Sequence, residues 1–444
     1  LLNLREELTK QSPYAKEYDT WADSFVGGIG AFPAEDGGEE SNAFLFIPND
    51  GNPEVYTGSV YLYNKKIIKD AGLDPEKAPV TWTDMFKWLE VLAQNKDVYP
   101  IAGSNLLGLK VSQIGALFGE NYQDLFFADE LNDPEFEDDL FWDKVYVLTC
   151  YDKGEGMPLD DLPYYPAQFK LMKQHLSYYQ PSWIENSVET EMLTFASGKS
   201  AMVLTAFWDY DTLASSLSES AFPEGYGIFQ IPYMGEDTLD YAVEQGWVTK
   251  DEAEAAKPWA VTRARSGGGA GVHDYGFCVN KTVKEDDAKY AAVIDFLQFM
   301  SSKDIQDKYV EAASSISPVK GVKLIDAMSA FLVEEPEGGF ANNTLGYYAI
   351  EWGVSDWPVI LQKYLNGEQD LAPTIEAITA PEWASDIPSE DALQEAVDTA
   401  KADLENAKDE EKEAKERAVR YAELRQKLYM DYYYNMTGNL EEKN

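Results

Sequence analysis

The chain offers only two histidines, His175 and His273, for imidazole chemistry. A His-based metal site or a Ser-His-Asp triad needs such groups, so this inventory argues against both. The sequence has no Gly-x-Ser-x-Gly elbow, Walker loop or His-Glu-x-x-His motif. Acidic residues are so frequent that no single pair indicates a glycosidase, whose mark is a carboxyl separation in space. We therefore expect no catalytic residues, no metal site and no cofactor.

Aromatic side chains point to a different kind of site. The chain has 11 Trp and 28 Tyr, more than a core alone would need. A sugar ring has an apolar face and a polar rim. Trp and Tyr cover the face with large, rigid contact area at low entropy cost, while Asp, Asn, Gln or Arg bond the hydroxyl groups. The composition therefore favours a carbohydrate site.

Trp208 and Asp209 are the leading candidates for that site, because they follow an apolar strand predicted over 200–204. In open α/β sheets the ligand crevice lies beyond the carboxyl ends of the strands. Tyr61 and Tyr63 lie two apart on one strand, so they share a face that either meets ligand or, as the stronger alternative, packs in the core. The other predicted ligand-binding residues are Trp183, Trp352, Gly268 and Tyr275.

Gly268 belongs to a glycine run over 267–271. The run lacks the preceding apolar strand and the following helix that a dinucleotide fingerprint requires. We interpret it as a flexible loop where backbone and ligand, or two lobes, come close. Tyr275 opens the strand predicted next, over 275–280.

The elements that must position these residues alternate between strand and helix. Strands are predicted over 58–64, 99–102 and 227–232 besides 200–204, and helices from Lys65, from Trp82 with Thr81 as cap, over 189–195 and over 286–301. Gly72 and Gly198 are expected to end helices. This rhythm is typical of an α/β protein. Trp82 and Trp88 are expected in the core.

The tail has a different pattern. From Ser389 onward, apolar residues repeat at spacings of four and three in an otherwise polar stretch. The favoured interpretation is a solvated helix or helical hairpin lying on the body, and the alternative is a partner-binding or dimerising coiled coil. Cys150 and Cys278 are both predicted to be small buried residues, with a disulfide between them left open.

The charge excludes several partners. The 444 residues include 36 basic and 79 acidic side chains, for a net charge of −43. Nucleic acids and anionic membranes are bound through Lys and Arg, so we expect neither as a partner. No stretch of about 18 apolar residues occurs, hence no transmembrane helix is predicted. The length fits two lobes plus additions.

Four segments in order carry a family resemblance. Tyr63-Asn64-Lys65 and its helix, then the helix start around Thr81-Trp82, are similar to motifs of family 1 extracellular solute-binding proteins, the carbohydrate receptors of ABC importers. The same holds for 195–202 with Trp208, whose equivalent stacks on sugar in relatives. A late helix over 291–302 followed by 317–321 completes the set.

The resemblance implies a two-lobed periplasmic-binding-protein type II fold, with hinge strands between lobes that close on a sugar and then dock on the ABC permease subunits. It predicts lobe 1 over 1–105 and 276–325, lobe 2 over 106–275 and 326–385, and a helical C-terminal extension over 386–444. We expect the start of lobe 1 to be missing. The precursor is expected to be a lipid-anchored, extracellular bacterial protein, from a Gram-positive cell, and a monomer.

Two other functions remain open at this point. A glycoside hydrolase or lyase would use the same aromatics with an acidic pair. A surface adhesion or scaffold protein would be built around the acidic tail helix. A carbohydrate receptor that is not an enzyme is the favoured prediction.

Overall fold

A computed structural model shows two compact units built from interleaved parts of the chain. Unit 1 comprises Leu1–Leu109, Tyr178–Tyr233 and Arg265–Phe340, and unit 2 comprises Lys110–Ser177, Met234–Ala264 and Ala341–Asn444. The structure describes residues 2–26, 28, 34–35, 43–44, 47–48, 59–115, 117–118, 136, 140, 143, 162–260, 276–313, 315–324, 326–331, 357–378, 388–408 and 412–431.

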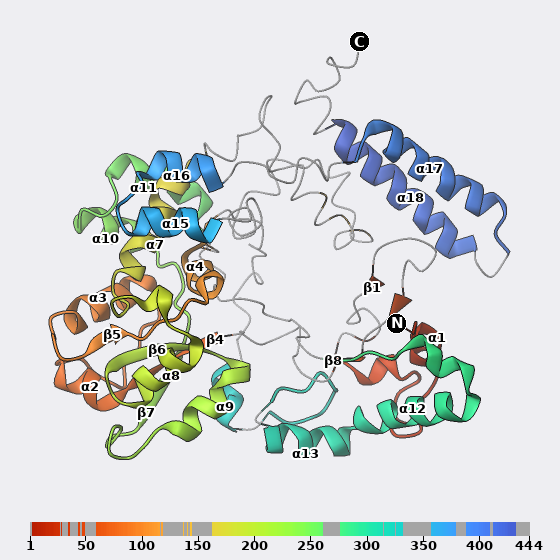
Figure 1. Ribbon diagram of the computed structural model, residues 1–444, viewed down its shortest axis with the longest axis horizontal. Coiled ribbons are helices and arrows are strands. Elements are labelled where there is room, and N and C mark those ends of the chain that lie inside the picture. The colour runs from red at the N-terminus through yellow and green to blue at the C-terminus, as the bar shows by residue number, and fades with distance from the viewer. Residues whose placement is uncertain are drawn as a thin grey trace, which may run out of the picture. The chain divides into compact units, whose positions relative to one another are not determined.

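Unit 1 contains a four-stranded mixed sheet (Figure 1). Its strands are β4 (Ser59–Asn64), β5 (Tyr99–Ile101), β6 (Ser200–Ala206) and β7 (Tyr226–Gln230), in the order β5-β6-β4-β7. β6 runs parallel to β5 and antiparallel to β4, and β4 also pairs with β7 in antiparallel register. Every residue of β4 and β6 is buried, as expected for apolar strands covered on both faces.

Helices pack around this sheet. They are α2 (Lys65–Asp70), α3 (Trp82–Leu92), α8 (Val188–Ala196) and α9 (Phe207–Ser216). The start of α3 is fixed by a capping box, in which the Thr81 side chain accepts from the Asp84 backbone while the Asp84 carboxylate accepts from the Thr81 backbone. Trp82 and Trp88 are buried, and Gly72 and Gly198 follow α2 and α8 with positive φ, so these predictions are confirmed.

This sheet crosses the lobe boundary predicted between residues 105 and 106. β4 and β5 precede that point and β6 and β7 follow it, yet all four share one hydrogen-bonded sheet. The strands were recognisable from their composition, but composition does not say which strand is the neighbour of which. Beyond this correction, the lobe assignment stays a prediction.

The rest of unit 1 holds a second core. Leu4, Trp21 and Phe25 pack there against Ile294 and Leu297. The other elements in the rest of unit 1 are α1 (Arg5–Leu8), η1 (Ala22–Ser24), β1 (Ala34–Glu35), β2 (Ala43–Phe44), β3 (Ile47–Pro48), β8 (Gly276–Phe277), η7 (Lys281–Glu285), α12 (Asp287–Met300) and α13 (Lys303–Ala313). η8 (Asp326–Phe331) packs on the four-stranded sheet, where Met328 and Phe331 are buried against Val60 and Leu62. β3 pairs with β8 and β1 with β2, both in antiparallel register.

Unit 2 is helical in the part that the structure describes. Lys170 Nζ lies 2.7 Å from Glu252 Oε1 and Lys173 Nζ donates to the Tyr364 carbonyl at 2.7 Å, which ties three of its helices together. These elements are α4 (Leu107–Gly115), which begins at the end of unit 1, α7 (Tyr165–Leu176), α10 (Thr238–Glu244), α11 (Lys250–Ala256), η6 (Lys257–Trp259), α15 (Trp357–Leu365) and α16 (Leu371–Ile378).

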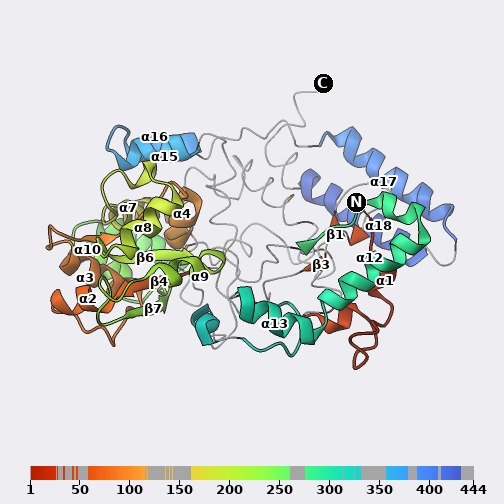
Figure 2. The same cartoon turned by 60° about the horizontal axis from the view of Figure 1, so that its bottom comes forward.

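The tail forms a helical hairpin. α17 (Glu390–Glu405) and α18 (Lys412–Tyr429) lie side by side in both views (Figures 1 and 2). Leu393 and Val397, from the predicted apolar seam, are buried. The described part of the tail therefore consists of two helices with a break between them.

Asp143 anchors this hairpin within unit 2. Its buried carboxylate accepts from Arg425 Nε at 2.9 Å on both oxygens and from the Tyr429 hydroxyl at 2.7 Å. Burial opposes the charged form of Arg425, yet Asp143 raises the pKa of that guanidinium. Burial, and then the charge of Asp143, raise the pKa of the Tyr429 hydroxyl. The anchor favours the interpretation of a hairpin lying on the body.

Cys278 is an exposed free thiol, so the prediction that it is buried is wrong. β8 ends at Phe277, one residue before it, which leaves Cys278 outside the sheet that an apolar run suggested. Cys150 lies outside the described residues. Across the described part of the chain, no helix combines the length and the apolar character needed to cross a membrane.

Candidate functional site

Trp208 and Asp209 lie in the first turn of α9, which follows β6 without a break (Figure 2). The register places the carboxyl ends of β5, β6 and β7 at the same edge of the sheet. Trp208 is 46% exposed although it is the largest apolar side chain, whereas Asp209 is partly buried. An exposed indole and a carboxylate therefore follow directly on the strand end where a ligand crevice is expected.

The end of β5 brings a second group of residues to this edge. Asn105 N donates to the Asn186 carbonyl at 2.8 Å, and Asn186 Nδ2 approaches the Gly103 carbonyl at 3.4 Å. Trp183, which opens the short helix η5 (Trp183–Glu185), is partly buried, and its ring lies 5.3 Å from that of Tyr179. The loop over 103–105 and the segment over 179–186 thus form one bonded unit beside β5.

Gly103 sits at the closest point of this unit. A Cβ atom at that position would lie 2.4 Å from Tyr179 Cδ1 and 2.9 Å from Trp183 Cβ. Only a residue without a side chain allows the Tyr179 ring and the start of η5 to pack directly on the loop. The position of Trp183 therefore depends on Gly103.

Tyr61 and Tyr63 do not reach the surface. Tyr61 is fully buried and its ring stacks on Phe229 at 5.1 Å. Tyr63 is 4% exposed, meets Trp88 edge-on at 5.6 Å, and donates from its hydroxyl to the Pro75 carbonyl at 2.6 Å. Their strand lies in the sheet, and other side chains cover both residues. They therefore belong to the core, which was the stronger of the two alternatives drawn from the sequence.

Three predicted site residues, Trp352, Gly268 and Tyr275, lie outside the described residues. Of the eight predicted, Trp208, Asp209 and Trp183 are thus at the carboxyl edge of the sheet in unit 1, and two are buried.

The structure adds a buried acid that the sequence did not suggest. Glu191, on α8, is 3% exposed, and Ser104 Oγ donates to its Oε2 at 2.5 Å. In a chain this rich in Glu, nothing in the sequence distinguishes Glu191 from its solvated neighbours. Ser104 had a weak signal, since Gly103-Ser104-Asn105 follows a predicted strand directly.

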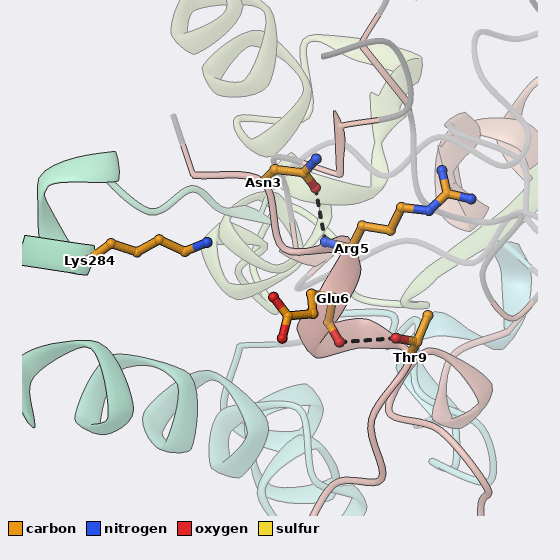
Figure 3. Close-up of a pocket in the computed structure, with 5 residues that line it drawn as sticks. All are labelled: Asn3, Arg5, Glu6, Thr9 and Lys284. Atoms are coloured by element: carbon orange, nitrogen blue, oxygen red, sulfur yellow. Dashed lines mark hydrogen bonds between the residues drawn. The ribbon is translucent and has the colours of Figure 1, made fainter. Parts of the chain in front are cut away.

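A separate pocket of 460 Å³ lies at the surface of unit 1, between α1 and η7 (Figure 3). Lys284 extends toward Asn3 and Glu6, while the Arg5 guanidinium points away from them. The Glu6 pKa is lowered by its hydrogen bond and ion pair with Lys10 and, less, by Lys284. None of the lining side chains (Asn3, Arg5, Glu6, Thr9 and Lys284) is aromatic, so the pocket has no stacking face for a sugar.

Metal chemistry finds no support in the described part of the chain, where no group of three His, Cys, Asp or Glu side chains could hold an ion. An exposed aromatic ring can stack on the face of a polar ring, and a carboxylate can accept hydrogen bonds from its hydroxyl groups.

Solved structures with a similar fold include a chitin oligosaccharide binding protein, with 18% identity, a TM-score of 0.48, and coverage of 85% of this chain and 77% of that one. A family 1 extracellular solute-binding protein from Bifidobacterium longum subsp. infantis has 14% identity, a TM-score of 0.44, and coverage of 85% and 82%. Maltose-bound MalE3 of T. maritima has 13% identity, a TM-score of 0.47, and coverage of 85% and 80%. No curated protein sequence matches the chain.

A sequence family identifies the chain more directly. Residues 50–334, well over half of the chain, match the family described as bacterial extracellular solute-binding protein. The matched region contains the whole four-stranded sheet and the edge that carries Trp208, Asp209 and Trp183. The chain therefore belongs to the bacterial extracellular solute-binding proteins, a family of non-catalytic receptors, and it is not an enzyme.

Proposed function

We propose that this solute-binding protein is a carbohydrate receptor, with an oligosaccharide as its ligand, that delivers the sugar to an ABC importer. The observation that carries the proposal is the exposed Trp208 ring beside Asp209 at the carboxyl edge of the sheet. An exposed indole offers a large flat face, and a sugar face matches it in size and rigidity. Asp209 supplies an acceptor for the hydroxyl groups of the rim.

Trp183 and the loop over 103–105 complete the proposed site. Trp183 belongs to the unit that is hydrogen-bonded to this loop, and the loop leads out of β5, the parallel neighbour of β6. Aromatic side chains on adjoining strand ends suit a ligand longer than one sugar ring, because each ring needs its own stacking face. Trp352, Gly268 and Tyr275 remain proposed contacts from the sequence.

The wider proposal follows the family's way of working. Two lobes joined by hinge strands close on the sugar, which shifts an open–closed equilibrium toward the form that docks on the permease. Lipid anchoring of the full-length precursor at the cell surface and a monomeric state belong to this proposal. The hydrolase or lyase alternative is wrong, because the family consists of non-catalytic receptors.

Isothermal titration calorimetry on the purified protein tests the ligand. The glycan panel would include chitin oligosaccharides, maltose and raffinose, which are named for structurally similar proteins. We expect at least one glycan to bind, and Trp208→Ala to weaken it by about fivefold or more, since loss of a stacked ring costs about 1–3 kcal/mol.

Trp247→Ala is the matched control, because Trp247 is partly exposed, packs on Tyr241 at 5.8 Å and belongs to unit 2 rather than to the sheet edge. It should leave the affinity unchanged. Equal affinity in the Trp208→Ala variant and the wild type would remove Trp208 from the site. Failure of every glycan to bind, with amino acids or peptides binding instead, would overturn the sugar proposal.

A further inference from the structure

A buried polar cluster lies behind the carboxyl edge of the sheet in unit 1. Glu191 is 3% exposed, Ser104 and Tyr61 are fully buried, and Tyr179 is 5% exposed. Ser104 Oγ donates to Glu191 Oε2 at 2.5 Å. Burial, and to a lesser extent Tyr179 and the charge of Glu191, raise the pKa of the Tyr61 hydroxyl. Glu191 and Ser104 are thus a hydrogen-bonded pair in the interior of unit 1, and the charge of Glu191 reaches the Tyr61 hydroxyl.

Burial of such a polar cluster in a core is energetically unfavourable. An acid taken out of water loses its hydration, and hydrogen bonds recover that loss only when their geometry is good. Apolar side chains of the same volume would pack there with at least equal stability. Apolar residues flank the pair along the chain, since Phe195, one turn after Glu191 on α8, and Ala102, two residues before Ser104, are buried in one hydrophobic core. The acid is thus better explained by what it holds in place than by stability.

What Glu191 holds is the loop over 103–105. Ser104 is its bonded partner, Gly103 on one side of Ser104 packs on Tyr179 and Trp183, and Asn105 on the other side is bonded to Asn186. The loop is therefore fastened from α8 through Glu191 and from the segment over 179–186. A shift of Ser104 would carry both neighbours with it.

The backbone just before Trp183 also has a constrained conformation. Ser182 has φ of 57°, and among the described residues it is the one non-glycine residue with positive φ. That conformation is unfavourable for a side chain with Cβ and persists only where the surroundings fix it. Ser182 is the residue from which η5 starts, so it sets the direction in which Trp183 leaves the chain.

We propose that Glu191 is a positioning residue for the ligand site, acting through Ser104 on the loop over 103–105 and on Trp183. The inference rests on the proposed function only in that the ligand is a sugar bound at this edge. Glu191 itself does not touch the ligand, since its side chain is buried.

The test compares Glu191→Gln and Ser104→Ala with Glu189→Gln. Glu189 lies on the same helix two residues away and is exposed, so its variant makes the same chemical change without touching the cluster. We expect the first two variants to weaken glycan affinity about tenfold, by analogy with metal sites, where loss of an outer hydrogen-bond partner costs at least that much. Glu189→Gln should match the wild type. The affinities come from calorimetry at one pH and salt concentration.

Met85→Ala separates positioning from stability. Met85 is fully buried in α3, so its truncation lowers the unfolding midpoint without touching the cluster. It should leave affinity unchanged even where its midpoint falls below that of Glu191→Gln. Equal loss of affinity in both variants would overturn the positioning role.

Hydrogen exchange makes the test independent of the ligand. The Asn105 amide is bonded to the Asn186 carbonyl, and in Glu191→Gln we expect it to exchange at least tenfold faster while the amides of β4 keep their rates. Faster exchange with no glycan bound by any variant would refute the sugar proposal and keep the positioning role. Unchanged exchange together with unchanged affinity would refute the positioning role alone.

Discussion

A methyl group at Gly103 would meet the Tyr179 ring at 2.4 Å, a separation that packed side chains do not tolerate. Gly103→Ala should therefore lower the free energy of unfolding by about 1–3 kcal/mol, the usual cost of overpacking. Because the displaced ring lies against Trp183, glycan affinity should fall in the same variant. Urea unfolding and calorimetry measure the two effects. A variant as stable as the wild type would show that the loop and Tyr179 separate easily.

His175 gives unit 2 a dependence on pH. Burial, and then the charge of Lys110, lower the pKa of His175 to about 3, from an ordinary value of 6.5. Between pH 6.5 and 3, His175 is therefore protonated in the unfolded chain and neutral in the folded protein. The contribution of the neutral imidazole to the free energy of unfolding is fully present above pH 6.5. It is lost as the pH falls, by up to about 1.4 kcal/mol per pH unit.

His175→Gln tests this by removing the titrating group. The variant pays a packing cost at pH 8, where the wild-type imidazole is neutral in both states, so that pH provides the internal reference. Between pH 6.5 and 5 its free energy of unfolding should fall less steeply than that of the wild type. Parallel curves over this window would mean that His175 takes up a proton without unfolding.

Among the elements, the tail hairpin depends most on a single side chain. Asp143→Asn removes the charge that Arg425 and Tyr429 share, and it replaces one acceptor oxygen by an NH2 donor that faces the two donors. We expect a loss of about 2–4 kcal/mol in the free energy of unfolding and faster proteolysis within α17 and α18. Asp398→Asn, on the exposed face of α17, should change neither. An intact, protease-resistant hairpin in Asp143→Asn would show that the helices are held by their apolar contacts.

The elements also show how far the sequence predicts this fold. Apolar β4 and β6, the Thr81 cap and the glycine ends of α2 and α8 are local patterns, and each was predicted. Strand partners are long-range, so the boundary at residue 105 was misplaced. Both faces of β4 are covered, which removes the alternation that would have shown where Tyr61 and Tyr63 point. Trp208 was predictable because it directly follows a strand, whereas Glu191 depends on tertiary packing alone.

For the whole molecule, charge is the dominant property. With 79 acidic and 36 basic residues, repulsion between like charges dominates. The Debye screening length falls from about 30 Å at 0.01 M salt to about 8 Å at 0.15 M. Raising sodium chloride between these concentrations should therefore raise the unfolding midpoint at pH 7, by roughly 2 °C or more. Near pH 4.2, where positive and negative charges balance, the same addition should have little effect. A salt-induced drop at pH 7 would show that ion pairs outweigh the repulsion.

The order of strands in the central sheet has a consequence for biosynthesis. β4 is an inner strand, and both of its neighbours, β6 and β7, come later in the chain. Roughly 140 residues separate β4 from β6, so at about 5–20 residues per second the ribosome leaves β4 unpaired for about 7–30 s. An apolar strand without neighbours is a substrate for chaperones and an aggregation hazard during that time. For an extracellular receptor this delay is useful, because a chain that cannot complete its sheet early stays unfolded enough for export from the cytoplasm.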